Sequence, residues 1–182
     1  GALMKKYLYM IAALFGIDYF CKENIEAQKP EDFPRDMEKS HGKIRLYRNH
    51  NDGFCFGIKK EKKELVRMVP VVFTSAAAGI LTWLLCRDEG RKADRIGFAL
   101  ITAGGLSNLY DRLKRGYVVD YFSIRCKYLE KVVFNLGDFF IFAGSALIAA
   151  SDLLGAVRDL SSPAEDHIKA LRLPWRRKDE AE

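Results

Sequence analysis

Residues Met68–Cys86 read Met-Val-Pro-Val-Val-Phe-Thr-Ser-Ala-Ala-Ala-Gly-Ile-Leu-Thr-Trp-Leu-Leu-Cys and contain no charged side chain over 19 positions. At 1.5 Å per residue, a helix of this length crosses a hydrocarbon core of about 30 Å. Its apolar residues occupy every face, whereas a surface helix of a soluble protein keeps a polar stripe. A core helix of a soluble protein is the alternative interpretation, and the length of the run favours insertion in a membrane.

Three further apolar runs flank this stretch. Residues 132–151 form a run of 20 residues interrupted by one aspartate, residues 96–110 form a run of 15, and residues 7–17 form a shorter run that ends in ionisable residues. We therefore predict an all-α integral membrane protein with four transmembrane helices. Their expected positions are about 5–22, 67–86, 95–111 and 132–157.

The 182 residues are the length of one domain. We expect residues 4–158 to form the membrane domain and residues 159–182 to form a polar, basic cytoplasmic tail. Residues 1–3 precede Met4 and are expected to be the remnant of an expression vector. We expect the first helix to stay uncleaved, because residues 17–20 are bulky and acidic where a cleaved signal peptide needs small residues.

A small β element is expected between the first two crossings, at about residues 40–60. Residues 44–48 alternate between apolar and polar side chains, which is typical of a half-exposed strand. Residues 49–53 read Asn-His-Asn-Asp-Gly, a turn signal, and residues 54–58 suit a second short strand. The pattern predicts a hairpin on the membrane surface, on the far side from both termini.

The charge of the chain does not orient it in the membrane. The net charge of +6 suits attraction to anionic lipid headgroups. Orientation follows from the lysines and arginines in short loops. Residues 87–95 carry four of them and residues 112–131, on the opposite side, carry six. Both sides are therefore basic.

Several kinds of catalytic site have no candidate residues in this sequence. The four cysteines are widely spaced without a paired motif, and the three histidines have no spacing suited to zinc. The chain has no nucleophile elbow, phosphate-binding loop or dinucleotide fingerprint. We expect no cofactor, no metal and no nucleic-acid partner, and what remains is chemistry carried by acidic side chains.

Two aspartates stand at the edges of apolar runs, in Val118-Val119-Asp120-Tyr121 and in Phe134-Asn135-Leu136-Gly137-Asp138. A carboxylate at the centre of a membrane helix costs about 2.5–3.5 kcal/mol, and less near the interface. Two carboxyl groups that lie close together share a proton, because both cannot ionise cheaply. The ionised member can take a proton from water while the protonated member donates to a scissile carbonyl oxygen.

Five sequence blocks between Asp18 and Asp138 resemble the motifs of signal peptidase II, the lipoprotein signal peptidase of bacteria. The motifs of that family read roughly Asp-Gln-x-x-Lys, Asn-x-Gly-x-x-Phe-Gly, Gly-Asn-x-x-Asp-Arg, Val-x-Asp-Phe and Phe-Asn-x-Ala-Asp. Here they correspond to the blocks that begin at Asp18, Asn51, Ser107, Val118 and Phe134. A single block would be weak evidence, whereas five blocks in the same order are specific.

The resemblance implies a four-helix membrane aspartic endopeptidase with a small extracytoplasmic β element. It would cleave diacylglyceryl-modified prolipoproteins just before the lipidated cysteine, as a monomer in the bacterial cytoplasmic membrane, with membrane lipids around it. The resemblance makes Asp120 and Asp138 the catalytic pair, and makes Asp18 and Lys22 structural. It assigns substrate binding to Asn51, Gly53, Asn108, Asp111, Arg112 and Asn135.

The chain departs from these motifs at several positions and is identified as a divergent member. Tyr19-Phe20-Cys21 stands where the family has Gln-Leu-Thr, and Ser107 replaces the glycine before Asn108. Tyr121 replaces a phenylalanine, and Gly137 replaces an alanine or valine. The substitutions leave both aspartates in place, but Ser107 and Gly137 lie beside expected site residues and can change the shape of the pocket.

Other interpretations of these residues stay open at this point. Asp111-Arg112 can be an interfacial ion pair at a helix end, and Asn51-Asp52-Gly53 can be a turn, a substrate contact or both. The whole chain can be a catalytically silent relative that binds lipoprotein precursors or lipids. It can also be a transporter or channel subunit whose acids relay protons, which predicts acids deep within several helices.

Overall fold

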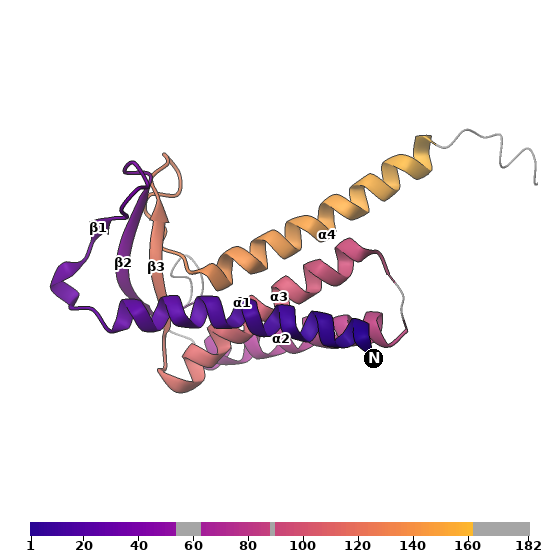
Figure 1. Cartoon of the computed structure of the whole chain (residues 1–182), viewed down its shortest axis with the longest axis horizontal. Coiled ribbons are helices and arrows are strands. Elements are labelled where there is room, and N and C mark those ends of the chain that lie inside the picture. Colours follow the sequence, from indigo (N-terminus) through magenta and orange to yellow (C-terminus); the bar gives the residue numbers. More distant parts are fainter. Residues whose placement is uncertain (54–62, 88–89, 162–182) are drawn as a thin grey trace, which may run out of the picture. The chain divides into compact units, whose positions relative to one another are not determined.

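The computed structural model describes residues 1–53, 63–87 and 90–161. This part of the chain is mostly helical, with one small sheet (Figure 1). The α-helices are α1 (Ala2–Glu26), α2 (Lys63–Cys86), α3 (Lys92–Lys114) and α4 (Leu136–Ser161). The strands are β1 (Arg35–Asp36), β2 (Ile44–Asn51) and β3 (Val118–Ile124), and η1 (Pro30–Asp32) is a short 3-10 helix.

The chain divides into two compact units, residues 1–148 and residues 149–182. In the first unit, both α1 and α2 pack against α3, and β2 and β3 contact α1. Figure 1 shows the sheet at the C-terminal end of α1. The second unit holds the C-terminal part of α4, and the residues that follow Ser161 lie outside the described part of the chain, as does most of the predicted tail.

Two of the described helices are long and apolar enough to cross a membrane, at Met68–Cys86 in α2 and Leu136–Arg158 in α4. Only 28% and 11% of their most apolar windows are buried within the protein. A core helix of a soluble protein would instead be largely buried. Trp83 on α2 and Phe142 on α4 are among the large apolar side chains that lie exposed. The two strongest predicted crossings therefore have the length, composition and exposure of membrane helices, while α1 and α3 fall short of that test.

Helix α3 lies very close to the start of α4, because glycines face each other across the contact. A methyl group at Gly104 would overlap the backbone oxygen of Gly137. A methyl group at Gly97 would lie 2.9 Å from the backbone oxygen of Gly144. Small residues that let two backbones approach in this way are typical of packed membrane helices.

The sheet differs from the predicted hairpin. Strand β2 pairs antiparallel with β1 and with β3, and its register joins Asn49 to Asp120 and Asn51 to Val118. The predicted turn at residues 49–53 is therefore wrong for residues 49–51, which continue the strand because β3 supplies a ladder of hydrogen bonds from far along the chain. The predicted second strand at 54–58 lies outside the described residues.

Each of the four helices differs from its predicted bounds by three or four residues at one end or at both. Helix α1 begins at Ala2, within the residues assigned to a vector remnant, and extends to Glu26. Helix α4 begins at Leu136 rather than near residue 132, because Phe134 forms a β-bridge with Phe122. The chain therefore leaves the sheet only one residue before the helix starts.

Candidate active site

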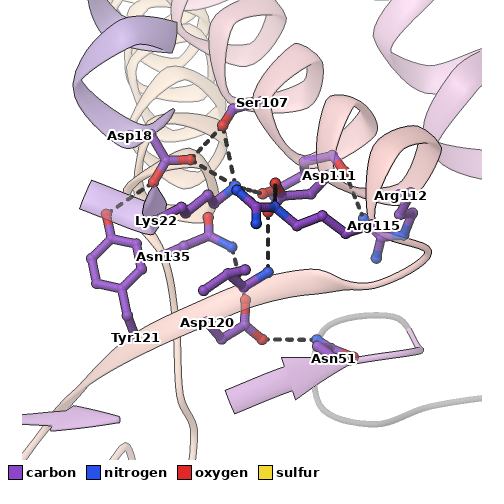
Figure 2. A network of polar contacts seen from close by, with 12 residues as sticks. Asp18, Lys22, Asn51, Ser107, Asp111, Arg112, Arg115, Asp120, Tyr121 and Asn135 are labelled. Carbon is purple, nitrogen blue, oxygen red and sulfur yellow. Dashed lines mark hydrogen bonds and ion pairs between the residues drawn. The ribbon is translucent and has the colours of Figure 1, made fainter. Parts of the chain in front are cut away.

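Asp120 is the third residue of β3, and two amide side chains hold its buried carboxyl group. Asn51 on β2 donates from Nδ2 to Oδ2 at 2.9 Å, and Asn135 donates from Nδ2 to Oδ1 at 2.8 Å (Figure 2). Asn51 reaches this position because it pairs with Val118 in the neighbouring strand. Each oxygen of Asp120 thus has one amide donor.

Asp138 lies in the first turn of α4 and forms a reciprocal cap with Asn135. The backbone N–H of Asp138 donates to Oδ1 of Asn135 at 2.8 Å, and the backbone N–H of Asn135 donates to Oδ2 of Asp138 at 3.3 Å. This arrangement satisfies two N–H groups at the helix start. The amide of Asn135 therefore touches Asp120 with its nitrogen and the backbone of Asp138 with its oxygen.

The two aspartates line the same cavity, which has a volume of about 170 Å³. Asn51, Asn108 and Arg112 complete its polar side. Helix α2 and α4 supply an apolar wall made of Val69, Pro70, Phe73 and Ile141. A cavity that is polar on one side and apolar on the other can hold a peptide bond against the acids while excluding most water.

Burial within this site changes the acidity of Asp120. Loss of hydration raises the pKa of its carboxyl group most, and the negative charge of Asp138 raises it further. The hydrogen bonds from Asn51 and Asn135 and the charge of Lys22 lower the pKa, and the balance brings it to about 7. Asp120 can therefore carry a proton near neutral pH, as one partner of a coupled acid pair requires.

Arg112 connects the cavity to the end of β2. Its Nη2 donates to the backbone oxygen of Gly53 at 2.8 Å, and Gly53 donates its own N–H to Oδ1 of Asn51 at 2.9 Å. The Asn51-Asp52-Gly53 segment thus contains a local turn stabilised by a side chain. Arg112 fixes that segment beside Asp120.

A buried network lies beneath the cavity and is built around Lys22. The Nζ atom of Lys22 lies 2.9 Å from Oδ2 of Asp18 and 3.2 Å from Oδ2 of Asp111. It also donates to Oδ1 of Asn108 at 2.9 Å. A buried ammonium group needs such partners, because desolvation of an unpaired charge costs several kcal/mol. Asp18, Lys22 and Asp111 are all fully buried.

Asp111 extends this network to the strand. Its Oδ2 accepts a hydrogen bond from the backbone N–H of Val119 at 3.1 Å, and its Oδ1 accepts one from Arg115 at 3.0 Å. Because Val119 precedes Asp120, Asp111 holds the strand next to the acid. Asp111 does not line the cavity, although the sequence assigned it to substrate binding.

The structure thus sorts the predicted site residues into two groups. Asp120, Asp138, Asn51, Asn108 and Arg112 line the cavity. Gly53, Asn135, Asp18, Lys22 and Asp111 contact those residues or the network beneath them.

Sequence reasoning missed two residues of the network. Arg115 pairs with Asp111, and the spacing of four residues between them within one helix was an available signal. Tyr121 donates a hydrogen bond to Oδ1 of Asp18 at 2.9 Å, and no local pattern indicates that contact. No group of three or more possible metal ligands occurs within residues 1–53, 63–87 and 90–161.

Comparison with known proteins gives consistent results. The sequence profile of the family described as Signal peptidase (SPase) II matches residues 10–154. A protein of Mesorhizobium japonicum named Lipoprotein signal peptidase is 30% identical over 157 residues, which are 86% of this chain and 90% of that protein. A protein of Brucella ovis with the same name is 34% identical over 116 residues, 64% of this chain and 71% of that protein.

Solved structures agree on the fold. Two structures described as a bacterial membrane enzyme, determined by the in meso method at 2.3 and 1.9 Å resolution, superpose with TM-scores of 0.68 and 0.66. Both are 20% identical to this chain in sequence. The first match covers 86% of this chain and 90% of the solved chain, and the second covers 82% and 93%. With the profile match over most of its length, this chain belongs to the signal peptidase II family of peptidases.

Proposed function

We propose that this chain cleaves signal peptides from diacylglyceryl-modified lipoprotein precursors, just before the lipidated cysteine, with Asp120 and Asp138 as the catalytic pair. The observation that carries the proposal is the shared cavity lined by both aspartates, whose positions are linked by the amide of Asn135. The relatives named Lipoprotein signal peptidase supply the substrate class.

The proposed reaction is a hydrolysis in which the acids exchange protons with water and substrate. In the proposed cycle the two carboxyl groups share one proton, which starts on Asp120, whose pKa is about 7, and Asp138 is the partner without it. Asp138 takes a proton from a water molecule as its oxygen attacks the scissile carbonyl carbon, and Asp120 donates its proton to the carbonyl oxygen. When the tetrahedral intermediate collapses, the C–N bond breaks and the proton on Asp138 goes to the leaving nitrogen. One hydroxyl group of the intermediate returns its proton to Asp120 as the carbonyl bond reforms, which restores the starting acid pair.

The surrounding side chains suit the handling of a peptide substrate. Asn51 and Asn108 carry amide groups, which can donate to and accept from a peptide backbone. Arg112 carries a charged fork of donors in the same cavity. A catalytically silent relative that only binds precursors is the alternative, and nothing in the site favours it, because both acids are present and buried.

A cleavage assay tests the catalytic assignment. The wild type and the Asp120→Asn and Asp138→Asn variants are incubated with a diacylglyceryl-modified prolipoprotein, and the product is followed by its shift on a gel. Each variant should lose activity by at least about 100-fold while remaining folded in the membrane. Full activity in either variant would end the assignment of that aspartate.

We further propose that all four helices cross the membrane and that the sheet lies on the extracytoplasmic side. Cys86 at the end of α2 and Cys126 after β3 are both exposed. Variants that keep only one of these cysteines can be treated with a membrane-impermeant maleimide in whole cells. Cys126 should react in intact cells and Cys86 only after permeabilisation, and the opposite pattern would refute this orientation.

A further inference from the structure

Asp18 is a fully buried carboxylate that joins four elements of the first unit. Its Oδ1 accepts hydrogen bonds from the hydroxyl of Tyr121 at 2.9 Å and from the backbone N–H of Leu136 at 3.1 Å. Its Oδ2 accepts one from the hydroxyl of Ser107 at 2.6 Å and lies 2.9 Å from Nζ of Lys22. The contacts with Tyr121, Ser107 and Lys22 are visible in Figure 2.

Two of these contacts lie next to the proposed catalytic pair in the chain. Tyr121 follows Asp120 directly on β3, and Leu136 begins the helix whose first turn carries Asp138. The hydroxyl of Tyr121 also accepts a hydrogen bond from the N–H of Leu136 at 3.1 Å. Tyr121 and Asp18 therefore connect the strand that holds one acid to the helix that holds the other.

The hydroxyl of Tyr121 is suited to this position. Burial raises its pKa, and the negative charge of Asp18 raises it further, so the hydroxyl keeps its proton and donates a hydrogen bond to the carboxylate. Ser107 acts in a similar way on α3. It accepts a hydrogen bond from Lys22 at 3.1 Å and donates one through its hydroxyl group to Asp18.

Three positions at which the chain departs from the motifs it resembles surround this one carboxylate. Ser107 and Tyr121 add hydroxyl groups that the glycine and phenylalanine of the motifs do not have. Gly137 lacks the side chain of the motif, and a methyl group there would lie 3.0 Å from Oδ2 of Asp18. The departures are thus one local rearrangement in which donors are added around Asp18 and space is kept beside it.

We propose that Tyr121 and Ser107 are positioning residues for the cleavage reaction. Through Asp18 and the N–H of Leu136, they hold β3 and the start of α4 in place. As a result, Asp120 and Asp138 face one cavity. The inference rests on the proposed function. Neither Tyr121 nor Ser107 lines the cavity, and both act through Asp18. Burial removes water from the Asp18 carboxylate. Tyr121 and Ser107, together with Lys22, supply the hydrogen bonds that water would otherwise give.

The test compares Tyr121→Phe and Ser107→Ala with matched controls. Tyr117→Phe is the control for tyrosine, because its hydroxyl also donates to a carboxylate of α1, that of Glu26 at 3.2 Å, away from the cavity. Ser145→Ala is the control for serine, since Ser145 is an exposed residue of α4. Rates are normalised to the amount of folded enzyme, measured from the monodisperse peak in size-exclusion chromatography.

The expected result is a change in catalysis rather than in binding. In Tyr121→Phe, kcat should fall by roughly tenfold with KM within about twofold, because a small misplacement of reacting groups lowers the rate steeply. Ser107→Ala should change kcat in the same direction, and both controls should stay at the wild-type value. If Tyr121→Phe does not yield folded enzyme, Ser107→Ala carries the same comparison.

The pH dependence of kcat separates positioning from a loss of folded protein. Among the charges near Asp120, that of Asp138 raises its pKa and that of Lys22 lowers it, and the charged Arg112 lines the same cavity. If the carboxyl groups separate in Tyr121→Phe, the charge of Asp138 raises the pKa of Asp120 less. Asp120 then loses its proton at a lower pH, so the fall of activity at high pH should begin at a lower pH. A wild-type kcat and an unchanged pH dependence in both folded variants would overturn the proposal.

A further measurement does not depend on cleavage. Hydrogen exchange of the peptide that contains Leu136 should be faster in Tyr121→Phe than in Tyr117→Phe, because only the first variant loses an acceptor for that N–H. Unchanged exchange would overturn the proposed link even in an active enzyme. Failure of the proposed function would appear differently, as a wild type that does not cut the precursor.

Discussion

Asn108 donates a hydrogen bond from Nδ2 to Oδ1 of Asp138 at 2.8 Å while its own Oδ1 accepts one from Lys22 at 2.9 Å. Lys22 can only donate, so its contact fixes which end of the amide points to Asp138. The lysine beneath the cavity thereby determines that Asp138 receives a donor. The site is supported from α1 although no residue of α1 lines the cavity.

The variant Asn108→Asp tests this orientation. The new carboxylate would keep an acceptor for Lys22 but would lose the donor to Asp138 and place a second negative charge beside it. We expect kcat at pH 7 to fall by about 100-fold, as when one oriented donor is removed from an active site. The control is Asn24→Asp, an exposed residue of α1, which should keep wild-type activity in the same precursor cleavage assay.

The activity of the wild type should fall as the pH rises through about 7. The reaction needs a proton on Asp120, whose pKa is about 7 in the folded protein, and that proton is lost above this value. Asn51→Ala removes a hydrogen bond that lowers this pKa, so the fall should begin at a higher pH in the variant. A rate profile between pH 5 and 9 measures both, and an identical high-pH fall in the two enzymes would contradict the assignment.

Stability should depend on pH through the same residue. The folded state keeps a proton on Asp120 up to about pH 7, whereas the unfolded chain releases it near 3.8. This difference contributes on the order of 4 kcal/mol to the free energy of unfolding. The contribution is complete below the pKa of the unfolded chain and is lost as the pH rises towards 7. Thermal unfolding in detergent should show a smaller decrease in Tm between pH 5 and 8 for Asp120→Asn than for the wild type.

Lys22→Met should destabilise the protein strongly. The change leaves the buried carboxylates of Asp18 and Asp111 without their shared cation, and breaking a buried ion pair costs about 3–5 kcal/mol. The corresponding decrease in Tm is roughly 6–20 °C for a chain of this size. Lys6→Met, at an exposed position of α1, is the control and should leave Tm nearly unchanged.

Gly104→Ala should disturb both packing and activity. The added methyl group would meet the backbone oxygen of Gly137, which directly precedes Asp138, so α4 must move. We expect a loss of about 1–3 kcal/mol of stability and a fall in kcat of about tenfold. Gly79→Ala on α2 places the same methyl group in open space and should be neutral or slightly stabilising. Equal behaviour of the two variants would refute the close contact.

The helices were predictable from the sequence because their signal is local. The charge-free runs place α2 and α4 to within a few residues, since length and apolarity are properties of the segment itself. The start of α4 was predicted about four residues too early, because it depends on a bridge between Phe134 and Phe122, which is a tertiary contact. Helix boundaries are set by such contacts as much as by propensity.

The sheet and the network were harder to predict. The Asn49-His50-Asn51 sequence favours a turn, yet it continues β2 because β3 offers a partner strand. Asp120 and Asp138 stood out because a carboxylate beside an apolar run is rare. The roles of Tyr121 and Ser107 depend on contacts with Asp18 across 103 and 89 positions of the chain, and no spacing rule reaches that far.

The amide of Asn135 has opposite tasks at its two ends, because its nitrogen serves Asp120 and its oxygen serves the backbone of Asp138. Deamidation of this residue would change almost nothing in shape and would still cap the helix. It would nevertheless turn a donor into an acceptor facing a carboxyl group. Deamidation at this single position would therefore leave a folded protein in which a third carboxylate, at position 135, is repelled by Asp120 and Asp138.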